Sequence, residues 1–137
     1  MITQKYLNGL TYTLIGCAID VHRELGPGLL ESIYHKCFLE ELKDKRLAFQ
    51  SQLSVPVDYK GKFLDSELRL DVLVEDIIIV ELKAVELLHP LFDAQLLTYM
   101  KLLQKPKGLL INFNCTNIFK EGQKTMVNEL FASLPKQ

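Results

Sequence analysis

The sequence predicts a mixed α/β (or α+β) domain whose central sheet is flanked by helices, in the order α-α-β-β-β-α-β-α. Three observations carry this prediction. Apolar residues recur at spacings of three and four over about residues 7–46, which indicates helices. They alternate at period two over about residues 52–74, which is typical of half-buried strands. In residues 77–84 the first residues are all apolar, so both faces of this strand are apolar, as expected for a central strand covered on both sides.

The first two predicted helices are delimited by recognisable signals. The first runs from about residue 7 to residue 25 and stops at Gly26-Pro27-Gly28, because glycine tolerates positive φ and proline cannot continue the helical ladder. The second is expected over about residues 30–46, with basic residues in its last turn that complement the helix dipole.

The remaining elements alternate between strand and helix. A third helix is expected to begin at Pro90, which suits a first helical turn, and to run to about Gln104. A final amphipathic helix is expected over about residues 122–134. One four-stranded mixed sheet should contain the strands at about residues 52–59, 63–74, 77–84 and 109–113.

Composition predicts a single globular domain over residues 1–137. A content of 48% hydrophobic and 24% charged residues argues against extensive disorder. No apolar run approaches the roughly 20 residues of a membrane span. The first residues lack the basic-then-apolar layout of a secretory signal, so a cytoplasmic location is expected. The three cysteines lack the spacing of a disulfide framework or a metal site and are expected to be small core residues. The three histidines also lack ligand spacing and are expected to be structural or at the surface.

The net charge of −1 bears on possible partners. Proteins that hold nucleic acid by neutralising phosphates usually carry a basic surplus, which this chain lacks. Tight DNA binding by the isolated chain is therefore not expected. A nuclease remains compatible with this charge, because bound cations partly offset its carboxylates.

Charged residues interrupt two of the most apolar strands. Glu81 and Lys83 stand two residues apart in the central strand, so their side chains leave the same face, and Asp71 interrupts the preceding strand. Two carboxylates brought together repel each other unless a cation lies between them, and Mg²⁺ commonly takes one or two protein carboxylates. The alternative is a surface salt bridge between Glu81 and Lys83 on a strand exposed on one face.

Strand register decides whether the two acids can meet. With a two-residue turn at Glu75-Asp76, Asp71 would face Val80, and Glu81 would point to the other side of the sheet. A shared cation site therefore requires one extra residue, in a three-residue loop or a bulge near the turn. We predict that irregularity.

These residues resemble a known motif. Asp71, separated by nine residues from Glu81-Leu82-Lys83, is similar to the D…ExK half-motif of the PD-(D/E)XK nuclease superfamily, whose core order α-β-β-β-α-β matches the predicted order. The resemblance implies a restriction-endonuclease-like fold.

The chain more narrowly resembles the GxxExxY protein family within that superfamily. Gly28, Glu31 and Tyr34 form the motif that names the family, and residues 21–28 before it are also similar. The resemblance covers about residues 5–125. Its later blocks are Arg69-Leu70-Asp71, Val80-Glu81-Leu82-Lys83-Ala84, Gln95-Leu96-Leu97-Thr98-Tyr99 and Leu109-Leu110-Ile111-Asn112-Phe113.

The resemblance implies a metal-dependent catalytic site. Asp71 and Glu81, with the Leu82 carbonyl, would bind Mg²⁺ or Mn²⁺, and Lys83 would orient or help to deprotonate the attacking water. Glu31 would be a further ligand or contact a metal-bound water. A structural interpretation of Glu31, as a first-turn acid favoured by the helix dipole, stays open.

Four more residues are implied as substrate-binding or supporting residues. Gln95 and Tyr99 share a helix face at i and i+4 and would hold the active site or the DNA strand, although surface packing of that helix is an alternative. Arg69 would brace the site or meet phosphate, or else lie at the surface. Tyr34 would support the site or belong to the core. Phe92 occupies a position at which similar proteins often carry histidine, so no proton-transfer role is expected there.

Two functions follow as expectations. The first is a phosphodiester hydrolase that acts on DNA, less favourably on RNA, with weak affinity when alone. The second is a non-catalytic interaction or regulatory subunit with the same fold, working in a homodimer or with a protein partner and not with a membrane. The complete set of Asp71, Glu81 and Lys83 favours the enzyme. Small size, near-neutral charge and the expected absence of a DNA-grasping extension favour the subunit.

Overall fold

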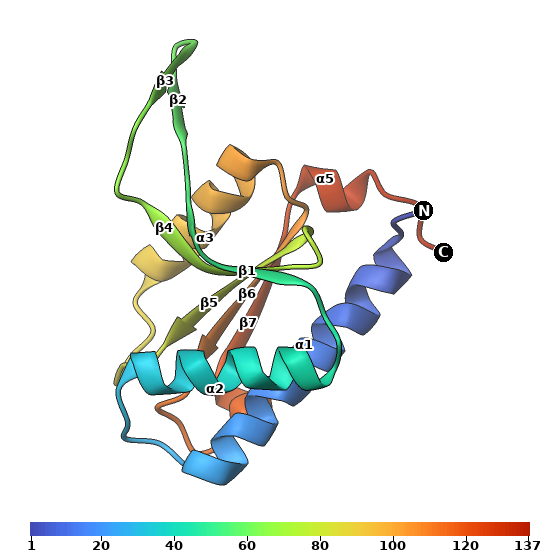
Figure 1. The fold of residues 1–137 in the computed structure, drawn as a ribbon. Coiled ribbons are helices and arrows are strands. Elements are labelled where there is room, and N and C mark those ends of the chain that lie inside the picture. The colour runs from blue at the N-terminus through green and yellow to red at the C-terminus, as the bar shows by residue number, and fades with distance from the viewer.

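The computed structural model describes residues 1–137 and contains a five-stranded mixed sheet in the order β1-β4-β5-β6-β7 (Figure 1). Neighbouring strands are antiparallel except for the parallel pair β5–β6. The predicted central position of the strand around residues 77–84 is confirmed, because β5 is the middle strand. The strands are β1 (Phe49–Ser54), β4 (Arg69–Val74), β5 (Ile78–Lys83), β6 (Lys107–Asn112) and β7 (Gln123–Val127).

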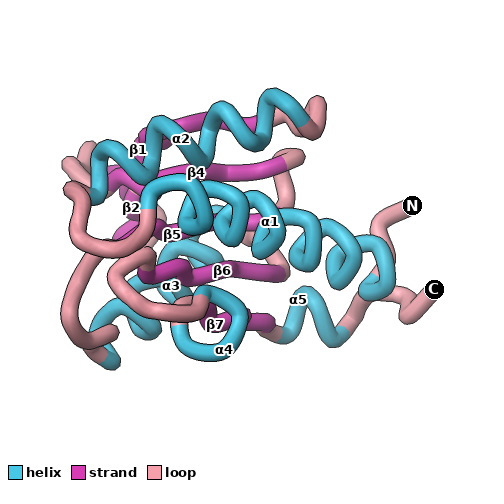
Figure 2. Tube along the Cα trace, turned by 90° about the horizontal axis from the view of Figure 1, so that it is seen from below, coloured by secondary structure: helices cyan, strands magenta, loops and turns pink.

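Helices cover both faces of this sheet. The long helices α1 (Gln4–Leu25) and α2 (Glu31–Asp44) lie on one face, and α3 (Pro90–Leu103) lies on the other (Figures 1 and 2). The face under α1 and α2 holds a core of 19 buried residues, whereas the α3 face holds 8. The α3 face is thus the one with less apolar packing, which matters for the site described below.

Local chemistry explains where the helices begin and end. Thr3 caps α1 by accepting a 3.0 Å hydrogen bond from the Tyr6 N–H, and Gly26 ends the helix with φ of +68°. His89 caps α3 through Nδ1, which accepts from the Leu91 N–H, and Pro90 follows as the first helical residue. The predicted starts and stops of these helices are confirmed within a few residues.

The prediction of a helix over residues 122–134 is wrong. Residues 123–127 form β7 on the outer edge of β6, and only a short helix, α5 (Glu129–Ala132), follows it, after the equally short α4 (Ile118–Glu121). All six residues of β6 are buried, so an uncovered edge would leave buried backbone groups without partners. That requirement outweighs a weak helical spacing, and the sheet has five strands instead of the predicted four.

The strands expected at residues 52–59 and 63–74 are each broken. The chain leaves the main sheet after β1, forms a separate hairpin of β2 (Val57–Tyr59) and β3 (Lys62–Leu64), and returns into β4. Figure 1 shows this hairpin, which we call the arm (residues 57–64), standing clear of the body on the α3 side. The sequence pattern did not predict this hairpin extension. At the base of the arm, Val55 donates its N–H to the Leu68 carbonyl at 2.9 Å.

No helix of the chain has both the length and the apolar character needed to cross a bilayer.

Candidate metal centre

The β4–β5 hairpin contains the predicted extra residue. Val74 pairs with Ile78, so residues 75–77 form a three-residue turn, and the backbone register continues to the Val72–Val80 pair. The next residues in that register are Asp71 and Glu81, which therefore stand opposite each other. The register prediction is confirmed.

At this point two carboxylates replace the backbone ladder. The Asp71 N–H donates to Glu81 Oε2 at 2.7 Å, and the Leu82 N–H donates to Asp71 Oδ2 at 2.8 Å. Each acid therefore reaches across to the backbone of the other strand. The second oxygen of each carboxylate accepts no hydrogen bond from the protein and keeps contact with solvent. The two carboxylates are held in place with one oxygen each still available.

The acids are poorly solvated. Strand alternation puts Glu81 on the same side as Ile79, which belongs to the core packed against α3. Asp71 stands where this alternation is interrupted, because Leu70 and Leu73 both belong to that core. Glu81 is only 4% exposed, and no ion pair joins it to Lys83, so the alternative of a surface salt bridge does not hold.

Burial and mutual repulsion make ionisation of both acids unfavourable. Burial, followed by the charge of Asp71, raises the pKa of Glu81 to about 8. Burial also raises the pKa of Asp71, against the lowering effect of the hydrogen bond from Leu82. A divalent cation between these groups would relieve both penalties, because it neutralises the charge that the fold concentrates there.

Lys83 leaves β5 on the same side as Glu81, two residues further on. Its Nζ lies 4.5 Å from the centroid of the Phe92 ring, which α3 contributes. A cation over an aromatic face is held by the ring quadrupole without being neutralised. The ammonium group is therefore kept at the border of the acid pair with its charge available.

The start of α2 brings a third acid near the pair. Glu31 is the first residue of α2 and is exposed; its pKa is raised by partial burial and by the charge of Asp71, and lowered by Lys83. Tyr34 is fully buried and stacks on Phe113 with 4.5 Å between ring centroids. This structure thus places Glu31 beside the site and Tyr34 in the core.

Tyr34 also fixes the loop from which Glu31 emerges. Its hydroxyl donates to the Gly26 carbonyl at 2.5 Å and accepts from the Leu29 N–H at 3.1 Å. Within that loop Gly28 has φ of +99°, a conformation that favours glycine. Gly28 and Tyr34 therefore shape the loop, and Glu31 carries the charge.

The other predicted support residues divide into two groups. Tyr99 is buried, and its pKa is raised by burial and by the charges of Glu81 and Asp71, so it faces the acid pair from α3. Gln95 lies one turn earlier and is half-buried, without a hydrogen bond to the acids. Arg69 is exposed at the start of β4, opposite Ser54, and forms no ion pair. The structure brings Tyr99 to the site and leaves Arg69 at the surface.

His35 was expected to be a structural or surface residue, yet it lies close enough to Asp71 for its charge to lower that carboxyl's pKa. Its Nε2 is 2.9 Å from Ser51 Oγ. Gln52, opposite Asp71 on β1, is unpaired and has φ of +55°, so the ladder is interrupted on both sides of Asp71. The i, i+4 spacing of Glu31 and His35 on one helix was the available sequence signal.

Comparison with known protein families identifies the chain. The family model that matches it is the PD-(D/E)XK nuclease superfamily, over residues 8–126, from α1 to β7. The chain belongs to the PD-(D/E)XK nuclease superfamily. Proteins of this superfamily are usually nucleases and typically use divalent metals such as Mg²⁺. No curated protein and no solved structure matches the chain.

The donor set of this PD-(D/E)XK chain fits a hydrated hard cation. No group of three or more His, Cys, Asp or Glu side chains is arranged to hold a metal ion. Two carboxylates are nevertheless what Mg²⁺ usually takes from a protein, with waters completing its shell. The Leu82 N–H points toward β4, and the carbonyl of a strand residue points to the same side as its N–H. A third oxygen donor is therefore directed toward the gap between β4 and β5.

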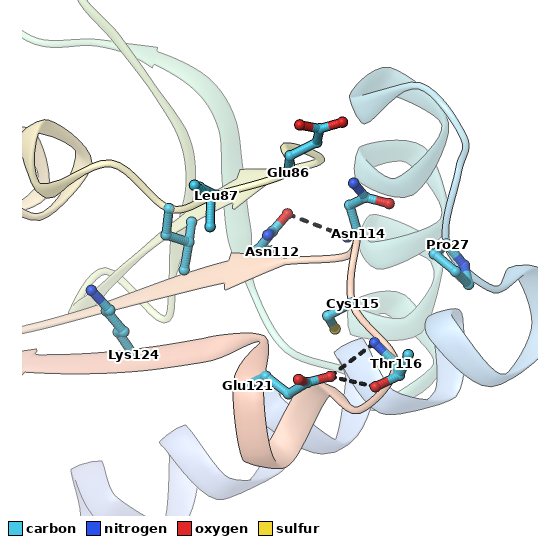
Figure 3. Close-up of a pocket in the computed structure, with 10 residues that line it drawn as sticks. Pro27, Glu86, Leu87, Asn112, Asn114, Cys115, Thr116, Glu121 and Lys124 are labelled. Atoms are coloured by element: carbon cyan, nitrogen blue, oxygen red, sulfur yellow. Dashed lines mark hydrogen bonds between the residues drawn. The ribbon is translucent and has the colours of Figure 1, made fainter.

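A cleft of about 610 Å³ opens where β5 and β6 end (Figure 3). Asn112 lines this cleft and pairs with Lys83 in the β5–β6 register. Its side chain accepts a hydrogen bond from the Val85 N–H and donates one to the Val85 carbonyl, so it holds the segment that follows β5. The acid pair is not part of the lining, which consists of Pro27, Glu86, Leu87, Leu88, Asn112, Asn114, Cys115, Thr116, Glu121 and Lys124.

Proposed function

We propose that this protein is a Mg²⁺- or Mn²⁺-dependent phosphodiester hydrolase that acts on DNA in preference to RNA. One observation carries the proposal: Asp71 and Glu81 stand opposite each other on neighbouring strands, with Lys83 on the same face, in a chain of a superfamily whose members are usually nucleases. The burial that raises the pKa of Glu81 to about 8 supports a cation site, since a buried acid pair is costly without one.

The proposed roles follow from position. When bound, the cation would activate a water molecule and offset charge on the phosphate. Asp71 and Glu81 would hold it, assisted by the Leu82 carbonyl. Lys83 donates from Nζ to the attacking water and stabilises the negative charge that develops during cleavage. Glu31, at the start of α2, would be a further ligand of the cation or would contact its water.

The supporting residues act by holding these groups. Tyr99 limits solvent access to the acids from α3, and Gln95, one helical turn before Tyr99, contacts the DNA strand. Arg69 is exposed two residues before Asp71, where a cation can meet a neighbouring phosphate.

We also infer that the chain belongs to the narrower GxxExxY group. The support is that each of the three motif residues has a separate structural role. Gly28 has positive φ, Tyr34 connects the loop to the core, and Glu31 stands near Asp71.

The second candidate is a non-catalytic nuclease-fold subunit. The net charge of −1 and the lack of a three-ligand group favour it. In that case a homodimer or a protein partner would provide the affinity for nucleic acid.

The deciding experiment incubates purified protein with labelled single- and double-stranded DNA and RNA in Mg²⁺ or Mn²⁺. We expect Lys83→Ala to slow cleavage by a factor on the order of 100 or more. Lys101→Ala, which removes an exposed lysine of α3, is the matched control and should cleave like the wild type. If the wild type and Lys83→Ala release the same products at the same rate, the cleavage comes from a contaminating nuclease and the proposal fails.

Metal binding is tested separately by calorimetric titration with Mn²⁺. Asp71→Asn should lose most of the binding heat, whereas Asp44→Asn, at the exposed end of α2, should keep it. Equal binding by both variants would remove the acid pair from the proposed site.

A further inference from the structure

The arm exposes apolar rings that the fold does not use. Phe63 is 79% exposed and Tyr59 is 57% exposed, although such side chains gain free energy when they are buried. A two-stranded hairpin without a covering element is only marginally stable in water. Figure 1 shows no helix or strand lying against the outer half of the arm. The exposed rings indicate a binding surface.

The tip of the arm is basic and aromatic. Residues 59–63 contain two aromatic rings and two lysines but no acid. Tyr59 pairs with Lys62, so these side chains share one face, and Lys60 Nζ lies 5.4 Å from the centroid of the Tyr59 ring. The nearby Asp58 is occupied in the turn, where its Oδ1 accepts from the Gly61 N–H at 2.9 Å. Positive charge and flat apolar surface therefore coincide at the tip.

The arm and the acid pair lie at the same end of the sheet. The chain enters the arm after Ser54 and returns at Arg69, which pairs with Ser54 and precedes Asp71 by two residues. Leu70, between Arg69 and Asp71, is buried in the core packed against α3, and Figure 1 shows the arm rising on the α3 side of the sheet. A strand bound at the acid pair would pass the base of the arm.

We propose that the arm binds an unpaired segment of the DNA substrate beside the acid pair, with Tyr59 and Phe63 stacking on bases and Lys60 and Lys62 contacting phosphates. The inference rests on the proposed function and names its substrate class, a single-stranded region. Bases expose their faces to aromatic side chains only where they are unpaired. Local charge at the tip gives a chain of net charge −1 a means of holding DNA.

A second copy of the chain fits the arm less well. Phe63 pairs with Asp58 and lies on the face opposite to Tyr59, so the two exposed rings do not belong to one apolar patch. Joining two arms at their tips would also bring four lysines together, and like charges placed opposite each other are destabilising.

The test measures binding of a short fluorescein-labelled single-stranded DNA by fluorescence anisotropy in EDTA, so that no cleavage takes place. Tyr59→Ala/Phe63→Ala should weaken binding by about 10-fold or more. Lys60→Ala/Lys62→Ala should reduce the slope of log affinity against log salt by about 1.4. Tyr59→Phe and Phe63→Tyr keep the rings and should keep wild-type affinity.

Matched controls lie at the opposite end of the molecule. Tyr6→Ala/Tyr12→Ala removes two exposed rings of α1, one of them 74% exposed, and Lys5→Ala/Lys136→Ala removes two exposed lysines near the termini. Both should bind DNA like the wild type. Coincident thermal unfolding curves establish that each variant is folded.

Several results would overturn the proposal: wild-type protein that binds no single-stranded DNA, arm variants that bind it normally, equal losses in the controls, or an arm-dependent preference for duplex DNA or for RNA. A wild-type dimer that only the arm variants dissociate, with DNA binding unchanged, would assign the arm to self-association instead. Failure of the hydrolase proposal is distinct, because it would leave arm-dependent binding intact while no variant or wild type cleaves DNA.

Discussion

At the turn end of the β4–β5 hairpin, Val74 pairs with Ile78 and both side chains are fully buried. At the other end, Asp71 and Glu81 follow the last pair, Val72–Val80, in the same register. The turn end satisfies its backbone through regular strand pairing. The site end uses carboxylates to accept backbone N–H groups. The same hairpin therefore contributes packing at one end and concentrated negative charge at the other.

A comparison of Glu75 with Glu81 shows what distinguishes the site end. Glu75, in the turn, also accepts a backbone hydrogen bond, from the Ala48 N–H at 2.6 Å. Glu75 is half-buried near the surface, whereas Glu81 is nearly inaccessible and faces another acid. A hydrogen-bonded carboxylate is thus common to both ends. Burial beside a second carboxylate distinguishes the site.

The largest effect should come from Glu81→Gln, compared with Glu75→Gln. Both substitutions keep an acceptor for the backbone N–H and remove one negative charge. We expect Glu81→Gln to reduce metal-dependent cleavage by about 10² to 10⁴-fold, because charge at the cation site is lost. Glu75→Gln should retain wild-type cleavage, measured as initial rates under saturating Mn²⁺. Similar losses for both variants would contradict the distinction between the two ends.

Ile78→Ala should destabilise the protein by removing core packing at the turn end of the hairpin. It removes a completely buried side chain from the core under α1 and α2, so the free energy of unfolding should fall by about 2–5 kcal/mol. Urea denaturation measures the change. The Mn²⁺ affinity of the folded variant should stay at the wild-type value. A loss within about 0.5 kcal/mol, as for surface positions, would show that this end is not a packing element.

The pH dependence of the free energy of unfolding should further distinguish the site end of the hairpin from its turn end. In metal-free protein the pKa of Glu81 is raised from 4.5 to about 8, so the stabilisation gained by its protonated form is complete below pH 4.5 and is lost as the pH rises through 8. Relative to Glu81→Gln, the wild type should therefore lose on the order of 5 kcal/mol across this window.

The measurement is urea denaturation of both proteins in EDTA at several pH values. Saturating Mn²⁺ should reverse the trend for the wild type, since the cation binds the ionised acids. Parallel pH curves for the wild type and Glu81→Gln in EDTA would show that this carboxyl titrates normally.

The smallest effect concerns the loop that presents Glu31 to the site end. Tyr34→Phe keeps the stacked ring but removes the hydroxyl that bonds Gly26 and Leu29. The free energy of unfolding should fall by about 1 kcal/mol, measured by thermal denaturation. Tyr12→Phe, at an exposed position of α1, is the control and should be neutral. Equal stability of the two variants would show that the hydroxyl does not hold the loop.

Much of the site end could be predicted from local patterns. Asp71, Glu81 and Lys83 stand out because charges are expensive in apolar strands, and the alternation rule required the extra turn residue that the structure contains. The contribution of His35 could not be predicted in this way. Its proximity to Asp71 depends on how α2 crosses β1, which brings together residues far apart in the chain.

The sequence by itself determined the first three helices, the central strand and the charged residues placed within apolar strands, because each of these depends on spacing between near neighbours. Only the tertiary structure decided that residues 123–127 become an edge strand, that the arm leaves the sheet, and that Phe92 contacts Lys83. The physical reason is that these features depend on contacts between distant segments. Periodicity indicates which face of a helix or strand is apolar. It does not indicate which other segment packs against that face or forms backbone hydrogen bonds with a strand edge.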